Sequence, residues 1–155
     1  MILVESSLKS EKGLQSVVNQ DYVLEFSCSQ GHLWLVADGE GENLRGVQAA
    51  RLFADTVRNF IEDNKITNVQ DLLCKAIMKA NEILHKKMLF AEGAFAFQQG
   101  NQVYVATFGK NKALLWHKKT LQEIQNSNPV LGQQAVIQPT ITALPIQKNS
   151  QILLL

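Results

Sequence analysis

Short apolar runs bounded by turn-forming residues occupy most of the first 40 positions of the chain. Runs of this kind, rich in valine, leucine and aromatic residues, are typical of β-strands. Three of them predict strands at residues 1–8, 21–28 and 32–38. The Ser-Gln-Gly sequence at residues 29–31 indicates a hairpin between the last two. An antiparallel sheet is therefore expected to begin the fold.

After this region the apolar residues recur every three or four positions, as on one face of a helix. The first such stretch runs from residue 46 to about residue 64, with this predicted face: Val47, Ala50, Phe53, Val57, Phe60 and Ile61. A second helix is expected to begin after Asn68, a suitable N-cap with Asp71 three positions later, and to end near Met88. Its inward residues would be Leu73, Ile77, Ala80 and Leu84. The two helices are expected to form an antiparallel pair that packs on the sheet.

The remaining sequence returns to strand-like patterns. Residues 93–124 divide into short apolar segments at the polar turns QGN, GKN and HKK, which predicts successive antiparallel strands in a β-meander. Residues 126–140 contain two of the three prolines and predict a surface loop. Two last strands are expected at residues 140–146 and 151–155. The element order predicts one α+β domain over residues 1–155, with layered antiparallel β-sheets and a helical hairpin packed on one face.

Composition and charge exclude several classes of partner. The chain is 46% hydrophobic and 19% charged, which is ordinary for a soluble domain. Its net charge of +1 offers no overall field for nucleic acid or an anionic membrane. Cys28 and Cys74 lie far apart, which argues against a disulfide framework or a thiolate zinc site. We therefore expect a cytoplasmic protein without nucleic-acid or membrane partners.

Asp38 is the first candidate for chemistry, because it ends an apolar strand and precedes an acidic turn that contains glycine. A carboxylate in this position is held by the sheet and can still face solvent, where a divalent cation could bind. Glu40 and Glu42 follow in the same turn and could add ligands. Acidic residues just ahead of a helix are also favoured by the helix dipole without any metal, so both interpretations stay open.

Three motifs occur in a recognisable order: GLQSVVNQDYV at residues 13–23, LVADGEGENLRGVQAARL at 35–52 and QVYVATFGKNKALLW at 102–116. They resemble the metal-dependent serine/threonine protein phosphatases of the PPM, or type 2C, family. That family has G-x-x-R-x-x-N-[EQ]-D, then D-G-x-G-G-x-x-x-G-x-x-A leading into a helix, and later A-x-x-G-D-S-R. The resemblance implies a layered α+β fold and hydrolysis of phosphoprotein substrates by a water held between two magnesium or manganese ions.

The resemblance also assigns individual residues. Asp21 falls on a carboxylate that contributes to the metal centre of the family. Asp38 falls on the aspartate that bridges the two ions, and Gly39 on the glycine whose carbonyl joins the coordination. Gly41 and Gly46 match the glycines that let the turn approach the site. The resemblance therefore implies a metal site containing Asp21, Asp38 and Gly39.

Several positions depart from the family pattern. Ser16 replaces the arginine that grips phosphate in the family, and Glu42 replaces the second glycine of the D-G-x-G-G turn. The GDSR segment reads Gly-Lys-Asn-Lys at residues 109–112, so Lys110 would repel cations or replace part of their charge. The family domain continues into S-D-G and D-N ligands, whereas this sequence ends at Leu155. These departures predict weakened binding of magnesium or manganese.

Three functional interpretations remain open. The first is a pseudophosphatase that has kept the fold and binds or regulates a protein partner. The second is an active metal-dependent serine/threonine phosphatase of which this chain is the N-terminal part. The third, an unrelated α+β binding domain, would make the three motifs a coincidence. The apolar last strand, QILLL, further predicts self-association through the C-terminal strand or binding of a partner there.

Overall fold

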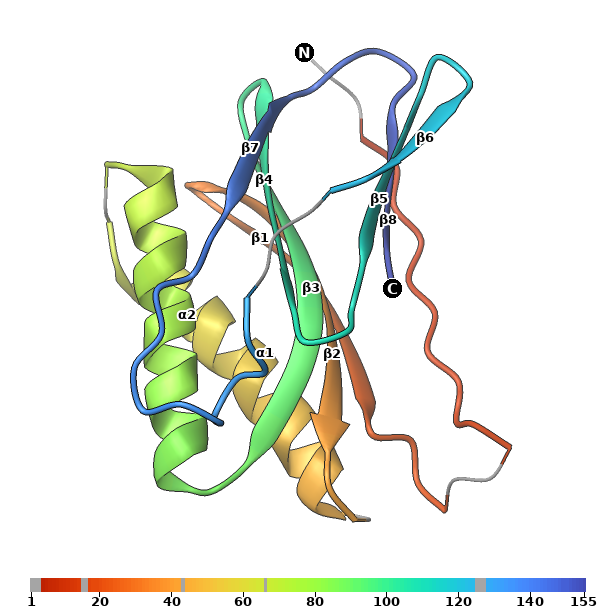
Figure 1. The fold of residues 1–155 in the computed structure, drawn as a ribbon. Helices are drawn as coiled ribbons and strands as arrows, with labels where there is room; N and C mark the ends of the chain where they lie inside the picture. Colours follow the sequence, from red (N-terminus) through yellow and green to blue (C-terminus); the bar gives the residue numbers. More distant parts are fainter. Residues whose placement is uncertain (1–3, 15–16, 43, 66, 125–127) are drawn as a thin grey trace.

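The computed structural model describes residues 4–14, 17–42, 44–65, 67–124 and 128–155 (Figure 1). Its elements, in chain order, are β1 (Asp21–Cys28), β2 (Gly31–Glu40), α1 (Leu44–Asp63), α2 (Val69–Lys86), β3 (Phe90–Gln99), β4 (Gln102–Phe108), β5 (Ala113–His117), β6 (Thr120–Glu123), β7 (Thr142–Pro145) and β8 (Gln151–Leu154).

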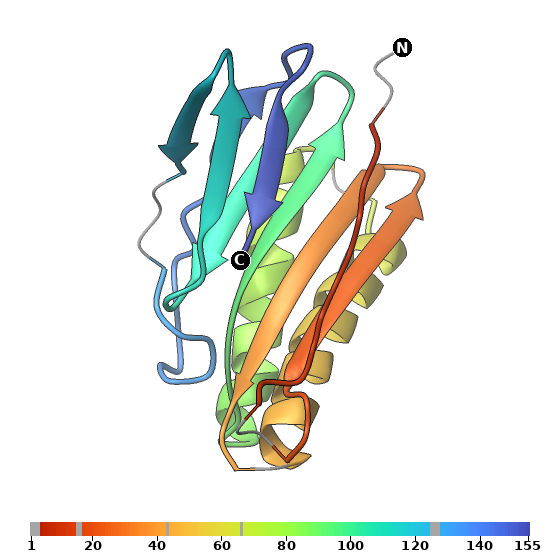
Figure 2. The same ribbon diagram turned by 90° about the vertical axis from the view of Figure 1, so that its right-hand side faces the viewer.

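These elements form three layers, visible in Figures 1 and 2. Strands β1-β2-β3-β4-β7 make a five-stranded antiparallel sheet, and β6-β5-β8 make a three-stranded one. Helix α1 packs on β1, β2 and β3, and α2 packs on α1 and β3, so both helices cover the same face of the larger sheet. The smaller sheet lies on the opposite side. The α+β class and the helical hairpin on one sheet face, both predicted from the sequence, are confirmed.

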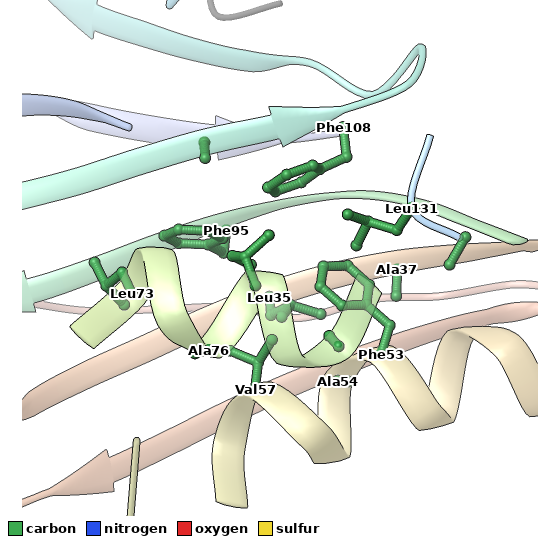
Figure 3. Close-up of a cluster of buried hydrophobic side chains, with 14 of the residues drawn as sticks. Leu35, Ala37, Phe53, Ala54, Val57, Leu73, Ala76, Phe95, Phe108 and Leu131 are labelled. Carbon is green, nitrogen blue, oxygen red and sulfur yellow. The ribbon is translucent and has the colours of Figure 1, made fainter. Parts of the chain in front are cut away.

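The larger core lies between the helices and the five-stranded sheet (Figure 3). In α1 the predicted residues Phe53 and Val57 are fully buried, whereas the predicted Val47 and Phe60 are only partly buried. All four predicted inward residues of α2 are buried. The ring of Phe53 meets Phe108 edge-on at a centroid distance of 6.0 Å. Residues from helix α1 and strand β4 thus meet directly in this core.

The start of α2 is also as predicted. The Asn68 side chain accepts a hydrogen bond from the backbone N–H of Asp71 at 3.1 Å, which satisfies one of the free N–H groups of the first turn. Neither helix of the described chain is both long enough and apolar enough to span a bilayer.

The strand predicted at residues 1–8 is wrong for the described part of that segment. Residues 4–14 contain no strand and run as an irregular segment over the face of β1 and β2 that is turned away from the helices (Figure 2). Residues 1–3 lie outside the described residues. The Ser6 hydroxyl donates to Glu25 Oε1 at 2.6 Å, so a side chain rather than a backbone ladder fastens this segment to the sheet.

The β-meander is correct within each pair of strands and wrong across β4 and β5. These two strands belong to different sheets, because the chain crosses between the layers at residues 109–112, where Gly109 has a φ of 68°. Polar residues between two apolar segments locate a turn, but they do not determine whether the next strand returns to the same sheet. The hairpins β3–β4 and β5–β6 and the last two strands, β7 and β8, are confirmed.

The loop predicted on the surface at residues 126–140 is partly buried in its described portion, which begins at residue 128. The Asn128 amide donates to the carbonyls of Thr107 at 3.0 Å and Thr140 at 2.9 Å, and its oxygen accepts from Thr140 N at 2.6 Å. Leu131 enters the core. Buried backbone groups need hydrogen-bond partners, and this segment is not part of a strand ladder that would supply them. The Asn128 side chain supplies several of these hydrogen bonds, so the irregular segment can enter the interior.

Candidate functional site

The junction between β2 and α1 is set by two glycines that touch. A Cβ on Gly39 would lie 1.8 Å from the carbonyl oxygen of Gly46, and a Cβ on Gly46 would lie 2.4 Å from the Gly39 oxygen. The Gly39 N–H also donates to the Gln20 carbonyl at 3.3 Å. Only residues without a Cβ allow this close approach. It turns Gly39 toward the helix and leaves the neighbouring Asp38 and Glu40 on the opposite face of the sheet.

Four carboxyl groups gather on that opposite face. The strand register places Asp21 of β1 directly across from Asp38 of β2, and Asp38 directly across from Glu92 of β3. Glu40 lies two residues beyond Asp38 on the same strand, and therefore on the same face. Residues opposite each other in antiparallel strands have neighbouring side chains. Three adjacent strands thus assemble one acidic cluster.

This cluster opens into a cavity of about 410 Å³ between the two sheets. The cavity is lined by Asp38, Glu40, Glu92, Lys110, Asn111, Lys112 and Leu155. Glu92 is only 6% exposed, and its Oε2 atom accepts a hydrogen bond from the backbone N–H of Lys110 at 2.7 Å. Gly109 leaves room for it, because a Cβ there would lie 2.5 Å from the Glu92 carboxyl carbon. The crossover between the sheets therefore closes over the buried glutamate.

The carboxyl groups repel one another. Burial raises the pKa of Asp38, and the charges of Asp21 and Glu92 and a hydrogen bond with Asp21 raise it further. Burial likewise raises the pKa of Glu40, together with a hydrogen bond to Glu92 and the charge of that residue. The Lys110 ammonium acts in the opposite direction on both groups. The cluster therefore has an excess of negative charge that a single lysine partly offsets.

The carboxyl groups of the acidic cluster are suitable ligands for a hard cation, but they are not arranged around a common point where one could bind. Magnesium and manganese prefer carboxylate oxygens, which this face of the sheet supplies. Within the described ranges, however, no group of three or more histidine, cysteine, aspartate or glutamate side chains is placed to hold a metal ion. The contacts are pairwise instead, between Asp21 and Asp38 and between Glu40 and Glu92. As it stands, the cluster does not fit a two-ion centre.

The structure brings together two of the predicted metal-site residues, Asp21 and Asp38. The third, Gly39, is adjacent but buried against α1. Ser16 lies outside the described residues. Lys110 lines the cavity beside the acidic residues, close to the position that the motif match implied. The assignment of these residues to a metal site stays a prediction.

The structure bears on Glu40, for which two interpretations were open, and adds a second glutamate, Glu92, to the cluster. Glu40 belongs to strand β2, and the first turn of α1 contains no acidic residue, so the helix dipole does not explain it. Glu92 was missed altogether. A signal for it exists in the sequence LFAEGAFAF, where one charged residue interrupts an otherwise apolar strand. A buried charge of this kind needs partners, which here are the Lys110 backbone and Glu40.

Comparison with known proteins identifies the fold. No protein-family model matches this chain, and no curated protein sequence matches it either. The structure resembles the Mycobacterium tuberculosis serine/threonine phosphatase PstP/Ppp with a TM-score of 0.77 at 17% identity, over 94% of this chain and 75% of that one. It resembles the S. agalactiae serine/threonine phosphatase with a TM-score of 0.84 at 13% identity, over 94% and 76% of the two chains.

A third similar structure is PppA, a key regulatory component of T6SS in Pseudomonas aeruginosa, with a TM-score of 0.76 at 19% identity over 89% of this chain and 70% of that one. The catalytic domain of PstP has also been solved in complex with two manganese ions. At these identities the likeness establishes the fold alone. The chain has the fold of the bacterial PPM-type serine/threonine phosphatases, as the three sequence motifs predicted.

Proposed function

We propose that this chain is a phosphatase-like domain of the PPM type that is catalytically impaired and acts by binding or regulating a protein partner. The observation that carries the proposal is the composition of the acidic cavity. Its carboxyl groups contact one another in pairs, and the Lys110 and Lys112 side chains line the same space. A fixed ammonium group disfavours a divalent cation beside it by direct repulsion.

The chemistry of the fold class explains why this matters. Two divalent ions would lower the pKa of a bound water and neutralise the phosphate oxygens. In this chain Asp21, Asp38 and the Gly39 carbonyl are the groups we assign to such ions. Ser16, where the family has arginine, offers one neutral hydrogen bond in place of a charged, bidentate contact with phosphate. We therefore expect magnesium or manganese to bind weakly and phosphate to be held poorly.

The alternative is an active phosphatase of which this chain is the N-terminal part. It is favoured by the acidic cluster itself, since the carboxyl groups of Asp38, Glu40 and Glu92 line a cavity of about 410 Å³ and Asp21 lies directly across from Asp38. The chain spans about three quarters of the length of the PstP and S. agalactiae structures. Residues outside it could complete a metal centre in this interpretation.

Metal titration and phosphate release separate these two functions. Manganese and magnesium are titrated into the protein by calorimetry, and phosphate release is measured from a phosphothreonine peptide and from para-nitrophenyl phosphate. We expect a dissociation constant of about 1 mM or weaker, the range of loosely assembled carboxylate sites, and no turnover above that of Asp38→Asn. Tight binding of two ions, with turnover abolished by Asp38→Asn, would refute the impaired-domain proposal.

A charge variant tests the role assigned to Lys110. We expect Lys110→Asp to tighten manganese binding at least about tenfold, because it removes a repelling charge and adds a carboxylate ligand beside the cluster. The matched control is Lys148→Asp, which makes the same exchange on an exposed lysine outside the cavity lining. An equal effect of the two variants would show that general surface charge, not Lys110, governs the binding.

The cytoplasmic location and the self-association through β8 that the sequence predicted remain part of this proposal. Strand β8 pairs with β5 along one edge. An apolar strand of this kind can pair with another chain along its other edge. Sedimentation over a range of protein concentrations checks this point.

A further inference from the structure

A groove of about 380 Å³ lies on the helical side of the molecule, between helix α2 and the segment at residues 135–137. Figure 1 shows the chain before β7 running alongside α2. The acidic cluster lies on the opposite face of the five-stranded sheet, so the core separates the two sites. We call this site the α2 groove. The lining residues that carry the argument are apolar or basic: Phe60, Lys75, Met78, Lys79, Val136 and Ile137.

One wall of the α2 groove is the outward face of α2. Lys75, Met78, Lys79 and Glu82 follow one another at intervals of three and four residues, which places them on one side of the helix. The residues that α2 buries in the core lie on the other side. Met78 is 39% exposed. The wall therefore offers a thioether between lysine side chains, whose carbon chains can also contact an apolar ligand.

The facing wall is held in place by hydrogen bonds to α2. The Asn81 amide, which is 1% exposed, donates to the Gln134 carbonyl at 2.9 Å, and its oxygen accepts from Gly132 N at 2.8 Å. His85 Nδ1 donates to the Gly132 carbonyl at 2.8 Å. Ile137 is buried at the other end of this wall. The groove is therefore formed before a ligand binds, which reduces the loss of conformational entropy on binding.

Apolar side chains from three parts of the chain stay accessible in the α2 groove. Val136 of the facing wall is 72% exposed, and Met78 reaches the groove from α2. Phe60 of α1 packs against the edge of the core, but it is only partly buried and borders the groove. Single exposed apolar residues are common, whereas a concave surface lined by several of them is typical of a binding site. The α2 groove can therefore receive a large apolar side chain.

Glu82 is the acidic residue of this lining, and its charge is already neutralised. Its carboxylate pairs with the Lys79 ammonium at 3.1 Å and also with the Lys86 ammonium. Hydrogen bonds from Lys86 and Lys79 lower the pKa of Glu82. The carboxylate therefore stays charged and occupied, and it offers little attraction to a cationic ligand.

Lys75 adds a positive charge that is not neutralised in this way. In the part of the chain that the structure describes, no carboxylate forms an ion pair with its exposed ammonium group. Asp71, one turn earlier on the same side, lies in the first turn of α2, where the helix dipole favours an acidic residue. Lys75 is thus available to a carboxylate of a ligand. The groove is therefore both apolar and basic.

We propose that the α2 groove binds a segment of a partner protein in which a large apolar side chain stands next to carboxylates. The apolar side chain contacts Met78 and Val136, and a carboxylate pairs with Lys75 at the rim. The inference rests on the proposed function, in which the domain binds a protein partner, and adds the chemistry of that partner. A partner in this groove leaves the acidic cavity open, so metal titration and partner binding can be measured separately.

Two other occupants fit the α2 groove less well. A symmetric contact with a second copy of this chain would bring the same lysines together. A bilayer presents a broad surface, whereas the groove is concave and suits an inserted side chain. Both occupants are outcomes of the experiment below.

Three designed peptides test the proposal directly. The first is a fluorescein-labelled peptide of about eight residues, with a central leucine–phenylalanine pair and glutamate at the other positions. The second has lysine in place of every glutamate, and the third has alanine in place of the central pair. We expect the fluorescence anisotropy of the first peptide to rise on titration with the full chain, less so at high salt. The other two should bind at least about tenfold more weakly.

Matched apolar variants locate the binding surface. We expect Met78→Gln with Val136→Gln to weaken binding of the first peptide about tenfold or more, because two apolar contacts are lost. The control is Met88→Gln with Val17→Gln, which makes the same exchanges at residues that are 70% and 82% exposed and lie outside the groove lining. The control variant should bind like the parent protein.

A charge variant tests the contact assigned to Lys75. We expect Lys75→Glu to weaken binding of the first peptide about tenfold and to improve binding of the lysine peptide, because the charge at the rim is reversed. The control is Lys148→Glu, which makes the same exchange on an exposed lysine in the turn before β8. It should leave the binding of both peptides almost unchanged. Circular dichroism checks that each variant is folded.

Several outcomes would overturn the proposal. They are no binding of the first peptide, equal binding of all three peptides, or equal effects of the variants and their controls. Binding to phosphatidylserine vesicles without binding to the first peptide would assign the groove to a membrane. A dimer of the parent protein that Met78→Gln with Val136→Gln abolishes would assign it to a second copy. None of these results changes the metal titration, so the proposed impairment of the acidic cavity is judged independently.

Discussion

At the scale of single residues, Glu25 links the N-terminal segment to the sheet. Its Oε1 atom accepts hydrogen bonds from Ser6 Oγ at 2.6 Å, His32 Nε2 at 2.9 Å and Trp34 Nε1 at 3.1 Å. The hydrogen bond from Ser6, followed by those from His32 and Trp34, holds the pKa of Glu25 below its ordinary value of 4.5. The carboxylate form of Glu25 is therefore favoured when residues 4–14 are in place.

We predict that Glu25→Gln loosens the N-terminal segment. Because the folded pKa of Glu25 is lowered, the attachment should be complete above pH 4.5 and be lost as the pH falls through the lowered pKa. Hydrogen exchange of residues 4–14 and trypsin cleavage after Lys9 and Lys12 measure the loosening. Both should rise in the variant at pH 7, while the exchange of β2 stays slow.

Glu11→Gln is the control for this prediction. Glu11 lies in the same segment and pairs with Lys9 at 2.9 Å, but both side chains are exposed. Its loss should therefore leave hydrogen exchange and cleavage almost unchanged. Equal loosening by the two variants would mean that Glu25 has no special role.

At the scale of elements, the β5–β6 hairpin is well paired but has an unsuitable turn. Its two strands are joined at residues 118 and 119, both lysines with positive φ. A residue with a Cβ in this conformation is disfavoured by roughly 1–2 kcal/mol. The pairing of the two strands thus outweighs the preference of the turn residues for other conformations. The hydrophobic and polar pattern of the strands was sufficient to predict the hairpin.

We predict that Lys118→Asn with Lys119→Gly stabilises the protein. Asparagine and glycine adopt the left-handed conformation readily, so the free energy of unfolding should increase by about 1 kcal/mol. Guanidinium denaturation followed by circular dichroism measures the change. Lys65→Asn is a control, because it removes an exposed lysine that has no positive φ. A loss of stability in the double variant would contradict the assigned turn.

At the scale of the whole molecule, two cores of unequal size hold the three layers together. The larger lies between the helices and the five-stranded sheet, and the smaller lies between the two sheets. Phe53 of α1 is fully buried in the larger core and meets Phe108 of β4. One side chain thus couples the helical layer to the strand that leads to the smaller sheet.

We predict that Phe53→Ala lowers the free energy of unfolding by about 3–5 kcal/mol, the usual effect of removing a buried aromatic ring and leaving a cavity. Thermal and chemical denaturation measure it. Phe90→Ala is the control, because Phe90 is 36% exposed at the start of β3 and should lose much less. A small effect at Phe53 would mean that the surrounding layers collapse readily into the space.

The sequence by itself determined the local features of this protein. The helical spacing placed Phe53, Val57 and the inward residues of α2 in the core, and Asn68 capped its helix as expected. The glycine-containing turn between β2 and α1 was also apparent. These features depend on neighbours within a few residues, where spacing and backbone preference act directly. The motif order was sufficient to predict the fold class.

Only the tertiary structure decided the rest. Alternation along a strand tells which residues share a face, but not which sheet the strand joins or what lies opposite. The split between β4 and β5, the irregular segment at residues 4–14, and the pairing of Glu40 with buried Glu92 therefore could not be predicted. The same limit applies to Trp116 and Leu121 of the three-stranded sheet, which are 41% and 59% exposed although their sequence pattern matches that of a buried strand.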